Sequence, residues 1–414
     1  MKLHSLKAFF LLAILMTWGC KSNSQQIKTP AKPIDETKVT WVKGIDQAIK
    51  QAQDEGKLLF VECYSPNCPY CMALEPNFSK PEVAKMYNTN FVNYKLNVED
   101  PEEVKFLNSK GLWLPSFPML LFFDNDGNLV HQSGTDPNVE ALNNVAKTAL
   151  DDKKNTTSYK SRFAAGERGI SYLADYANYA RVVKDTMTNI KVAEAMYEVY
   201  PKDKLGSEES WKLTKKAVAD LDNGFATYWL AHVTEAGAME TKDGHPGNEN
   251  NILGAVVQTT LYGQKGKNYN LKNLDNVEKA MNKIGAGQYA ENVLWEFRLK
   301  ANIRENHPQE ALAIAQRMVT KFAQNGSAIV YIVRVLADNF KDNSYVPQAE
   351  KWMAQAIPTI TQDNVKAEYH YEMARLAMKS GKVEDAKKYA NEALTIATKL
   401  NTKDPKFANL KNSL

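Results

Sequence analysis

The sequence is poor in cysteine, in net charge and in long apolar runs, and each shortage excludes a class of protein. Four cysteines in 414 residues are too few for a scaffold held together by disulfides. The formal net charge is only +4 and no dense basic stripe occurs, so nucleic acid is not an expected partner. Beyond residue 20 no apolar segment is long enough to span a membrane. The remaining composition, 44% hydrophobic and 24% charged, is that of a globular protein, and its length predicts two or more domains.

The first 20 residues have the pattern of an export signal. A basic start precedes an unbroken apolar run, 8–16, which is too short to span a bilayer comfortably but suits a signal-peptide core. Gly19 directly before Cys20 resembles a bacterial lipoprotein cleavage site, at which the cysteine becomes the lipid-modified first residue. We therefore expect an exported protein of the periplasm or cell envelope, anchored in a membrane through Cys20. A plain signal peptide or an uncleaved anchor is the alternative, because Thr17 stands where that family usually has Leu.

A polar linker, 21–38, leads into a segment, 39–150, in which helical and strand patterns alternate. Strands are predicted at 58–64, 91–98, 119–123 and 129–132, with a tight hairpin turn at 124–127 and a short further strand at 39–41. The predicted helices include one that begins at the sequence Cys68-Pro-Tyr-Cys71 and runs to about Tyr87. The order helix, strand, helix, strand, helix, strand, strand, helix predicts an α/β fold with a mixed central sheet flanked by helices.

After a second polar linker, 151–165, the chain to its end, 166–414, is predicted to be all-helical. Small or apolar residues recur there at offsets of 38 residues (from 311 to 349) and 37 residues (from 349 to 386). They form three triplets: Ala311, Ala315 and Met318; Ala349, Met353 and Ala356; and Ala386, Ala390 and Ala393. Small residues at helical spacing let paired helices pack closely. We interpret this region as a tetratricopeptide-like array, clearest in 305–400, with a helical bundle as the alternative.

One pair of cysteines carries the clearest chemistry. Cys68 and Cys71 form a C-x-x-C pair where a predicted strand ends and a predicted helix begins. At a helix N-terminus the backbone N–H groups and the helix dipole favour the thiolate, which is the nucleophile in disulfide exchange. Cys71 lies one helical turn further on, from where it can attack the mixed disulfide and release the substrate.

The surroundings of this pair resemble the thioredoxin superfamily over residues 40–150, which is roughly a quarter of the chain. Pro76 stands where thioredoxins have a helix-kinking proline, and Glu62 stands where they place a buried carboxylate that moves protons for the second cysteine. Lys95 matches the lysine near that carboxylate. Pro118, in the run Ser-Phe-Pro-Met, matches the cis-proline that faces the cysteine pair and holds an extended substrate backbone.

The resemblance implies a thiol–disulfide oxidoreductase whose catalytic residues are Cys68, Cys71, Glu62 and Pro118 and which needs no bound cofactor. Its expected substrates are protein disulfides or dithiols, and its expected upstream partner is an electron donor at the membrane. Reduction is favoured over oxidation or isomerisation, because the acid and the overall pattern are thioredoxin-like. The motif Cys-Pro-Tyr-Cys is that of glutaredoxins, but the long stretch before Pro118 is not, so glutathione binding is not inferred.

Each of these assignments has a simpler alternative. Cys68 and Cys71 would otherwise form a structural disulfide or a metal clip, although zinc wants about four ligands and no histidine lies close in sequence. Cys63 is expected to pack as a buried apolar residue, with a role as an extra redox partner as its alternative. In the simpler interpretation, Glu62 is a partly exposed strand residue, and Pro118 serves only to interrupt a strand at the edge of the sheet.

The protein as a whole also has a second interpretation. The helical region would bind a protein partner on its concave face, and the thioredoxin-like fold would be a docking module in an assembly factor. The intact cysteine pair argues against this interpretation, because a purely structural module does not need it. A thiol peroxidase is less attractive still, because no Thr or Arg is arranged to activate the cysteine.

Overall fold

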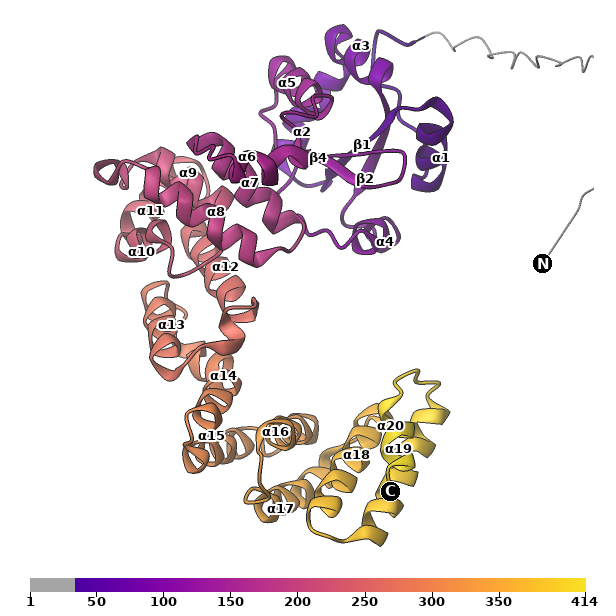
Figure 1. Ribbon diagram of the computed structural model, residues 1–414, viewed down its shortest axis with the longest axis vertical. Coiled ribbons are helices and arrows are strands. Elements are labelled where there is room, and N and C mark those ends of the chain that lie inside the picture. The colour runs from indigo at the N-terminus through magenta and orange to yellow at the C-terminus, as the bar shows by residue number, and fades with distance from the viewer. Residues whose placement is uncertain (1–33) are drawn as a thin grey trace, which may run out of the picture.

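The structure is a computed structural model that describes residues 34–414. The export signal, its candidate lipidation site Cys20 and most of the first polar linker lie outside the described residues, so these remain predictions. Over residues 34–414 no helix has the length and apolar character needed to cross a bilayer. An α/β domain lies at the N-terminal end of the described chain, and a curved succession of helices follows it (Figure 1).

The N-terminal domain is built on a four-stranded sheet in the order β2-β1-β3-β4. Its strands are β1 (Leu58–Tyr64), β2 (Phe91–Asn97), β3 (Met119–Phe123) and β4 (Leu129–Ser133). Strands β1 and β2 are parallel, whereas β3 runs antiparallel to both β1 and β4. The prediction of a mixed central sheet is therefore confirmed. The β3–β4 hairpin turns where the sequence predicts, because the Asp124 carboxylate accepts backbone N–H groups from Asp126 and Asn128 and Gly127 takes a positive φ of 76°.

Helices cover both faces of this sheet (Figure 1). They are α1 (Ile45–Glu55), α2 (Pro69–Leu74), α3 (Pro81–Asn90), α4 (Pro101–Ser109) and α5 (Val139–Ala149), with a 3₁₀ turn, η1 (Glu75–Ser79), after α2. One face packs Phe60 and Phe122 against α2, η1, α3 and α5. The other face packs Val61 and Leu121 against α1 and α4. Successive residues of β1 therefore point into two different cores, as the alternation of a strand requires.

Two local predictions in this domain are wrong. The helix expected to run from the cysteine pair to Tyr87 is three separate pieces, α2, η1 and α3. Pro76 and Pro81 lack the backbone N–H that a continuous helix needs, and their rings clash with the preceding turn. The short strand expected at 39–41 is a single bridge between Trp41 and Asn93.

After the sheet the described chain is helical to its end, which confirms the all-helical prediction for the second part of the protein. Its fourteen helices are α7 (Ile170–Val182), α8 (Thr186–Val199), α9 (Glu208–Ala217), α10 (Gly224–Ala231), α11 (Val233–Lys242), α12 (Asn248–Tyr262), α13 (Leu271–Lys283), α14 (Ala290–Arg304), α15 (Pro308–Lys321), α16 (Gly326–Asn339), α17 (Val346–Ala356), α18 (Asp363–Lys379), α19 (Val383–Lys399) and α20 (Lys406–Asn412).

The recurrent small residues lie at helix–helix contacts. Their three triplets fall on α15, α17 and α19, and all nine side chains are buried. Each of these helices packs against the helix before it, α14, α16 or α18, across a short connection. The pairs follow one another along a curve that leads away from the N-terminal domain, as Figure 1 shows.

The region between the two parts is folded rather than extended. Residues 151–165 contain a 3₁₀ turn, η2 (Thr156–Ser158), and a short helix, α6 (Tyr159–Ala164). The Thr156 hydroxyl donates a 2.8 Å hydrogen bond to the Val130 carbonyl at the start of β4. This segment therefore packs on the sheet domain before the chain enters α7.

Helix α7 then returns to the sheet domain at its last residue. Val182 is fully buried in the same core as Leu112 and Phe106. Its carbonyl oxygen accepts a 2.8 Å hydrogen bond from the backbone N–H of Trp113, which precedes Pro118 by five residues. The helical domain is thus attached to the segment that leads into β3.

We expect Val182→Ala to lower the free energy of unfolding by about 2 kcal/mol, because it removes two buried methyl groups and leaves a cavity at the junction. Val199→Ala is the matched control, since Val199 is the last residue of α8 but is exposed. Its effect should stay within about 0.5 kcal/mol. Urea-induced unfolding of the two variants and the wild type measures the difference, and equal effects would contradict the assigned packing of α7.

Candidate active site

The two motif cysteines lie at the start of α2 with different exposure. Cys68 is the residue before the helix and is partly exposed, whereas Cys71 is 5% exposed. The backbone N–H of Cys71 donates to the Cys68 sulfur at 3.3 Å. Pro69 occupies the first helical position, where a missing N–H costs no hydrogen bond. The helix start therefore presents one sulfur to solvent and holds the other beneath it.

The antiparallel pairing of β1 and β3 brings Pro118 to this pair. Cys63, near the end of β1, lies opposite Met119, the first residue of β3. The chain ahead of β3 consequently passes the start of α2, where the Cys68 thiol donates to the Phe117 carbonyl oxygen at 3.7 Å. The Phe117–Pro118 peptide bond is cis, and Pro118 is buried. Segments 49 residues apart in sequence thus meet at the cysteines.

Glu62 and Lys95 form a pair across the two central strands. The register of β1 and β2 places the two residues opposite each other, and the Lys95 ammonium lies 3.6 Å from the Glu62 carboxylate. Glu62 is 1% exposed, and its Oε2 atom makes no hydrogen bond within the described residues. Lys95 also contacts the exposed carboxylate of Glu75 and lies 5.0 Å from the centre of the Trp41 ring.

These surroundings shift the proton affinities of two groups in the site. Burial raises the pKa of Glu62 to about 7, an increase that the charge of Lys95 limits and that of Glu75 reinforces. Burial, together with the hydrogen bond to Cys68, raises the pKa of Cys71 to about 12. The negative charge of Glu62 also contributes to the shift at Cys71. An acid that changes protonation near neutral pH is therefore coupled electrostatically to a thiol that holds its proton tightly.

Cys63 faces away from this arrangement. It is fully buried in the core formed with α1 and α4, on the opposite face of the sheet from α2. Burial raises its pKa well above the usual range of a thiol. Cys63 therefore packs as an apolar residue, and its placement does not support a role as a third redox partner.

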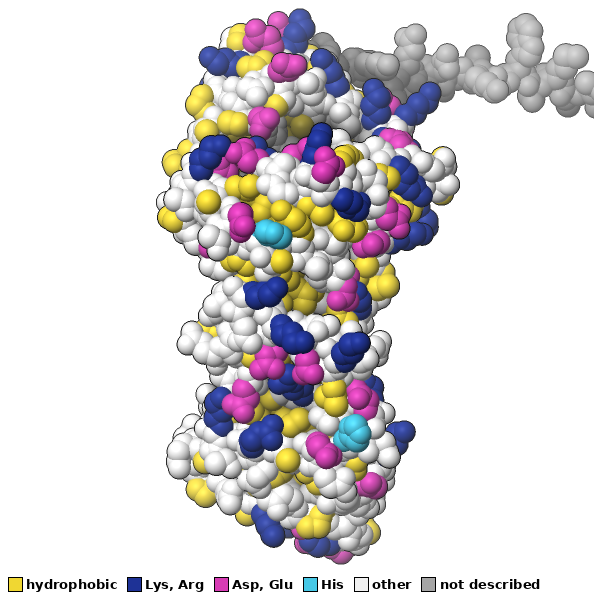
Figure 2. Space-filling view, turned by 90° about the vertical axis from the view of Figure 1, so that its left-hand side faces the viewer, with side chains coloured by type: hydrophobic (Ala, Val, Ile, Leu, Met, Phe, Trp, Pro, Cys, Tyr) yellow, Lys and Arg dark blue, Asp and Glu magenta, His cyan; other side chains and the backbone are white. Residues whose placement is uncertain are grey.

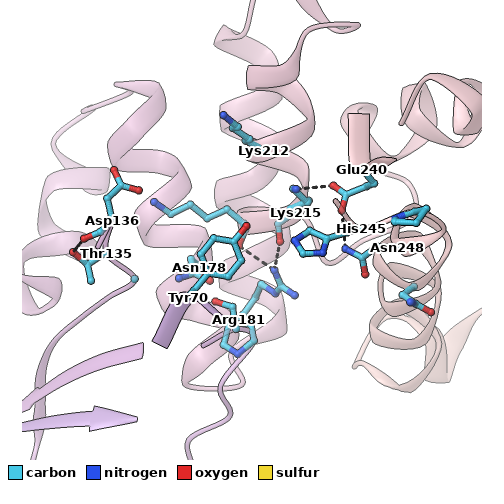
Figure 3. A pocket seen from close by; sticks show the side chains of 16 residues that line it. Tyr70, Thr135, Asp136, Asn178, Arg181, Lys212, Lys215, Glu240, His245 and Asn248 are labelled. Carbon is cyan, nitrogen blue, oxygen red and sulfur yellow. Dashed lines mark hydrogen bonds and ion pairs between the residues drawn. The ribbon is translucent and has the colours of Figure 1, made fainter. Parts of the chain in front are cut away.

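The helical domain reaches the motif from the other side. The ring of His245, in the connection between α11 and α12, lies 6.4 Å from the ring of Tyr70, between the two cysteines. A cleft of about 870 Å³ separates the two domains here. Figure 3 shows Thr135 and Asp136 along one side, residues of α7, α9, α11 and α12 along the other, and Tyr70 between them.

Within residues 34–414 no group of three or more His, Cys, Asp or Glu side chains is arranged to hold a metal ion. The alternative of a metal clip at Cys68 and Cys71 therefore has no further ligands in that part of the chain. On the face in Figure 2, basic and acidic side chains are interspersed without a large patch of one sign.

A mixed sheet between two helical layers, with a C-x-x-C pair at a helix start beside a cis-proline, defines the thioredoxin class of fold. Residues 45–171 match the family model of the thioredoxin-like domain, so the chain carries a thioredoxin-like domain followed by a helical domain. The chain is also similar to Anterior gradient protein 3 of mouse. The two are 27% identical over 117 residues, which is 27% of this chain and 70% of the relative.

The structure brings together four residues that the sequence analysis singles out, Cys68, Cys71, Glu62 and Pro118, with Lys95 at the same site. Sequence reasoning did not find Glu75, His245 or Arg181 at the site's edge. Glu75 follows Cys71 by four residues, which places it one turn on, and that spacing is the only local signal. His245 and Arg181 come from the helical domain, and no pattern in the sequence links them to the motif.

The raised pKa of Glu62 predicts a dependence of stability on pH. Below about pH 4.5 the carboxyl is protonated in both the folded and the unfolded state. Between 4.5 and about 7 the unfolded chain releases the proton and the folded protein keeps it, so stability falls as pH rises and then levels off. We expect the free energy of unfolding of Glu62→Gln, relative to that of the wild type, to increase by about 3 kcal/mol between pH 4 and pH 8.

Urea unfolding at a series of pH values measures this difference. Glu82→Gln is the control, since Glu82 is an exposed carboxylate in the first turn of α3, and its difference from the wild type should stay flat. A pH-independent difference for Glu62→Gln would show that Glu62 titrates like an ordinary exposed glutamate.

Proposed function

We propose that this protein is a thiol–disulfide oxidoreductase that acts on protein disulfides through Cys68 and Cys71. The observation that carries the proposal is the arrangement of one accessible and one buried cysteine beside Pro118 and a buried acid. A structural disulfide needs neither the accessible sulfur nor the acid, and burying a carboxyl costs stability that such a disulfide would not offset. The thioredoxin-like match over residues 45–171 supports the same conclusion.

The proposed reaction follows from the different solvent exposure of Cys68 and Cys71. The Cys68 thiolate attacks one sulfur of the substrate disulfide, so that a Cys68–substrate disulfide forms and the other substrate sulfur leaves as a thiolate. Cys71 gives its proton to the Glu62 carboxylate and attacks Cys68. This step forms the Cys68–Cys71 disulfide and releases the second substrate thiolate, so that two electrons pass from enzyme to substrate. Because burial raises the pKa of Cys71, the nearby proton acceptor matters most in this second step.

The proposed direction is reduction, and this direction requires a dithiol donor that returns two electrons to the Cys68–Cys71 disulfide. We place that donor at the membrane, and we place the protein itself at the cell envelope, held there by a lipid on Cys20. The basis is the N-terminal pattern of a charged start, an apolar run and Gly19-Cys20.

Reduction of insulin by dithiothreitol in the presence of the protein tests the activity. Cys68→Ser should abolish the catalysed rate, because it removes the nucleophile. Cys71→Ser should leave a stable mixed disulfide with the substrate, visible by mass spectrometry, because no second thiol resolves it. Cys63→Ala is the control and should keep the wild-type rate, since Cys63 lies on the far face of the sheet. Equal rates for the wild type and Cys68→Ser would contradict the proposal and return attention to a binding role of the helical domain.

The reduction potential of the Cys68–Cys71 couple, measured by equilibration with dithiothreitol or glutathione, tests the direction. A value near that of thioredoxin, about −270 mV, is expected for a reductase. A value near about −120 mV would instead identify an enzyme that introduces disulfides.

The proposed anchor has its own test in the cells that make the protein. Cys20→Ser should stop incorporation of labelled palmitate and move the protein from the membrane fraction to the soluble fraction, because the thiol is the acceptor of the lipid. Cys63→Ala provides the comparison with another cysteine. Unchanged labelling of the Cys20→Ser protein would rule out lipidation at this position.

A further inference from the structure

The cleft between the two domains carries unpaired positive charge on its helical wall. Arg181, in the last turn of α7, donates from Nη1 to the carbonyl oxygens of Lys215 and Lys216 at 2.9 and 3.0 Å. Its Nη2 has no acceptor, and no carboxylate lies within ion-pairing distance of it among residues 34–414. Burial lowers the pKa of Arg181 to about 10, which still leaves it charged at neutral pH. A partly buried charge without a counter-ion is costly, and an entering anion would offset that cost.

Two lysines of the same wall form ion pairs with carboxylates. Lys215 lies 2.6 Å from the buried carboxylate of Glu240, and Lys216 lies 2.5 Å from Asp175. Burial alone would raise the pKa of Glu240, but hydrogen bonds from Lys215, Asn248 and Trp211 outweigh it and hold the pKa below its usual value. Glu240 is thus an ionised anchor that neutralises Lys215 and connects α9, α11 and α12.

Lys212, one turn before Lys216 on α9, is exposed and makes no ion pair or hydrogen bond among the described residues. Among the described residues, Lys212 and Arg181 are therefore the Lys and Arg side chains of the cleft that form no ion pair. Apart from Glu240, Asp136 is the one carboxylate among the lining residues, and it belongs to the opposite wall.

The cleft is continuous with the candidate active site. Tyr70, which separates the two cysteines, lines it and is 56% exposed. Pro115 and Ser116 also line it, and the next residue, Phe117, provides the carbonyl oxygen beside the Cys68 thiol. Trp113, 43% exposed, lies with its ring 5.6 Å from the Arg181 guanidinium. A chain that places a disulfide at Cys68 therefore has a path along Tyr70 toward the cations.

We propose that the cleft binds the polypeptide next to the reacting disulfide and selects substrates with acidic residues there, through Arg181 and Lys212. This inference rests on the proposed function and makes the helical domain part of the substrate site. The occupant is an extended protein segment, because the cleft begins at Tyr70 and Ser116, beside the Cys68 thiol, where the proposed function places a protein disulfide. The exposed rings supply apolar contact, and the two cations supply the charge preference.

Two disulfide-bridged peptides that differ only in three flanking residues, glutamate or glutamine, test the selection. We expect the wild type to reduce the glutamate peptide with about fivefold higher kcat/KM, and we expect the ratio to shrink in about 0.5 M NaCl. Lys212→Gln should lower the ratio to the part that Arg181 alone supplies, and Lys212→Glu should lower it further. Lys388→Gln, on the exposed side of α19, is the matched control and should keep the wild-type ratio. Lys388→Gln should also reduce the small uncharged disulfide bis(2-hydroxyethyl) disulfide at the wild-type rate.

Fluorescence anisotropy with the same peptides, their cysteines replaced by serine, measures the preference without any redox step. Equal binding and equal reduction of the two peptides by the wild type would overturn the charge selection and leave the oxidoreductase function standing. Preferential binding of the glutamate peptide without reduction of any disulfide would refute the oxidoreductase function and keep the cleft as an acidic-peptide site.

Discussion

The pairing of β1 with both of its neighbours is the contact on which the candidate site depends. Antiparallel pairing with β3 brings the chain before Met119 to the end of β1, where the loop to Cys68 begins. Parallel pairing with β2 places Lys95 opposite Glu62. One central strand therefore supplies the acid, directs the helix that carries the cysteines, and aligns the lysine and the proline on either side. A slip of one residue in its register would turn Glu62 into the opposite core and remove it from the site.

The position of Glu62 is an electrostatic compromise. A carboxyl buried without a positive neighbour would stay protonated at neutral pH, and a carboxylate in a close, exclusive ion pair would stay ionised. Here the Lys95 ammonium lies 3.6 Å from the Glu62 carboxylate, but it also forms an ion pair with Glu75 at the protein surface. Burial therefore outweighs the attraction of Lys95, and the pKa of Glu62 rises to about 7. A group with that proton affinity can accept a proton in one step and return it in another without a large change in free energy.

Much of the thioredoxin-like domain could be predicted from its sequence, because its signals are local. Apolar runs mark the strands, Asp124 to Gly127 marks the hairpin, and the cysteine spacing marks a helix start. The break of the predicted helix also has a local cause in Pro76 and Pro81, and Pro76 is already identified from the sequence as a position at which the helix is kinked. The residues of the interdomain cleft gave no such signal. Tyr70 and His245 are far apart in sequence, and the packing of the segment before α7 and of α7 itself on the sheet domain brings their elements together.

That packing also restricts how the helical domain can act. Arg181 and Val182 are neighbours on α7, yet the first faces the cleft and the second lies in the core of the sheet domain. The cleft cannot widen by a free swing of the helical domain, because such a motion would expose Val182 and break its backbone hydrogen bond to Trp113. This contact therefore limits how far the helical domain can move relative to the cysteines, and a charge preference at a fixed place in the substrate requires such a limit. The helices from α13 onward lie farther along the curve in Figure 1, and none of the residues that line the cleft belongs to them.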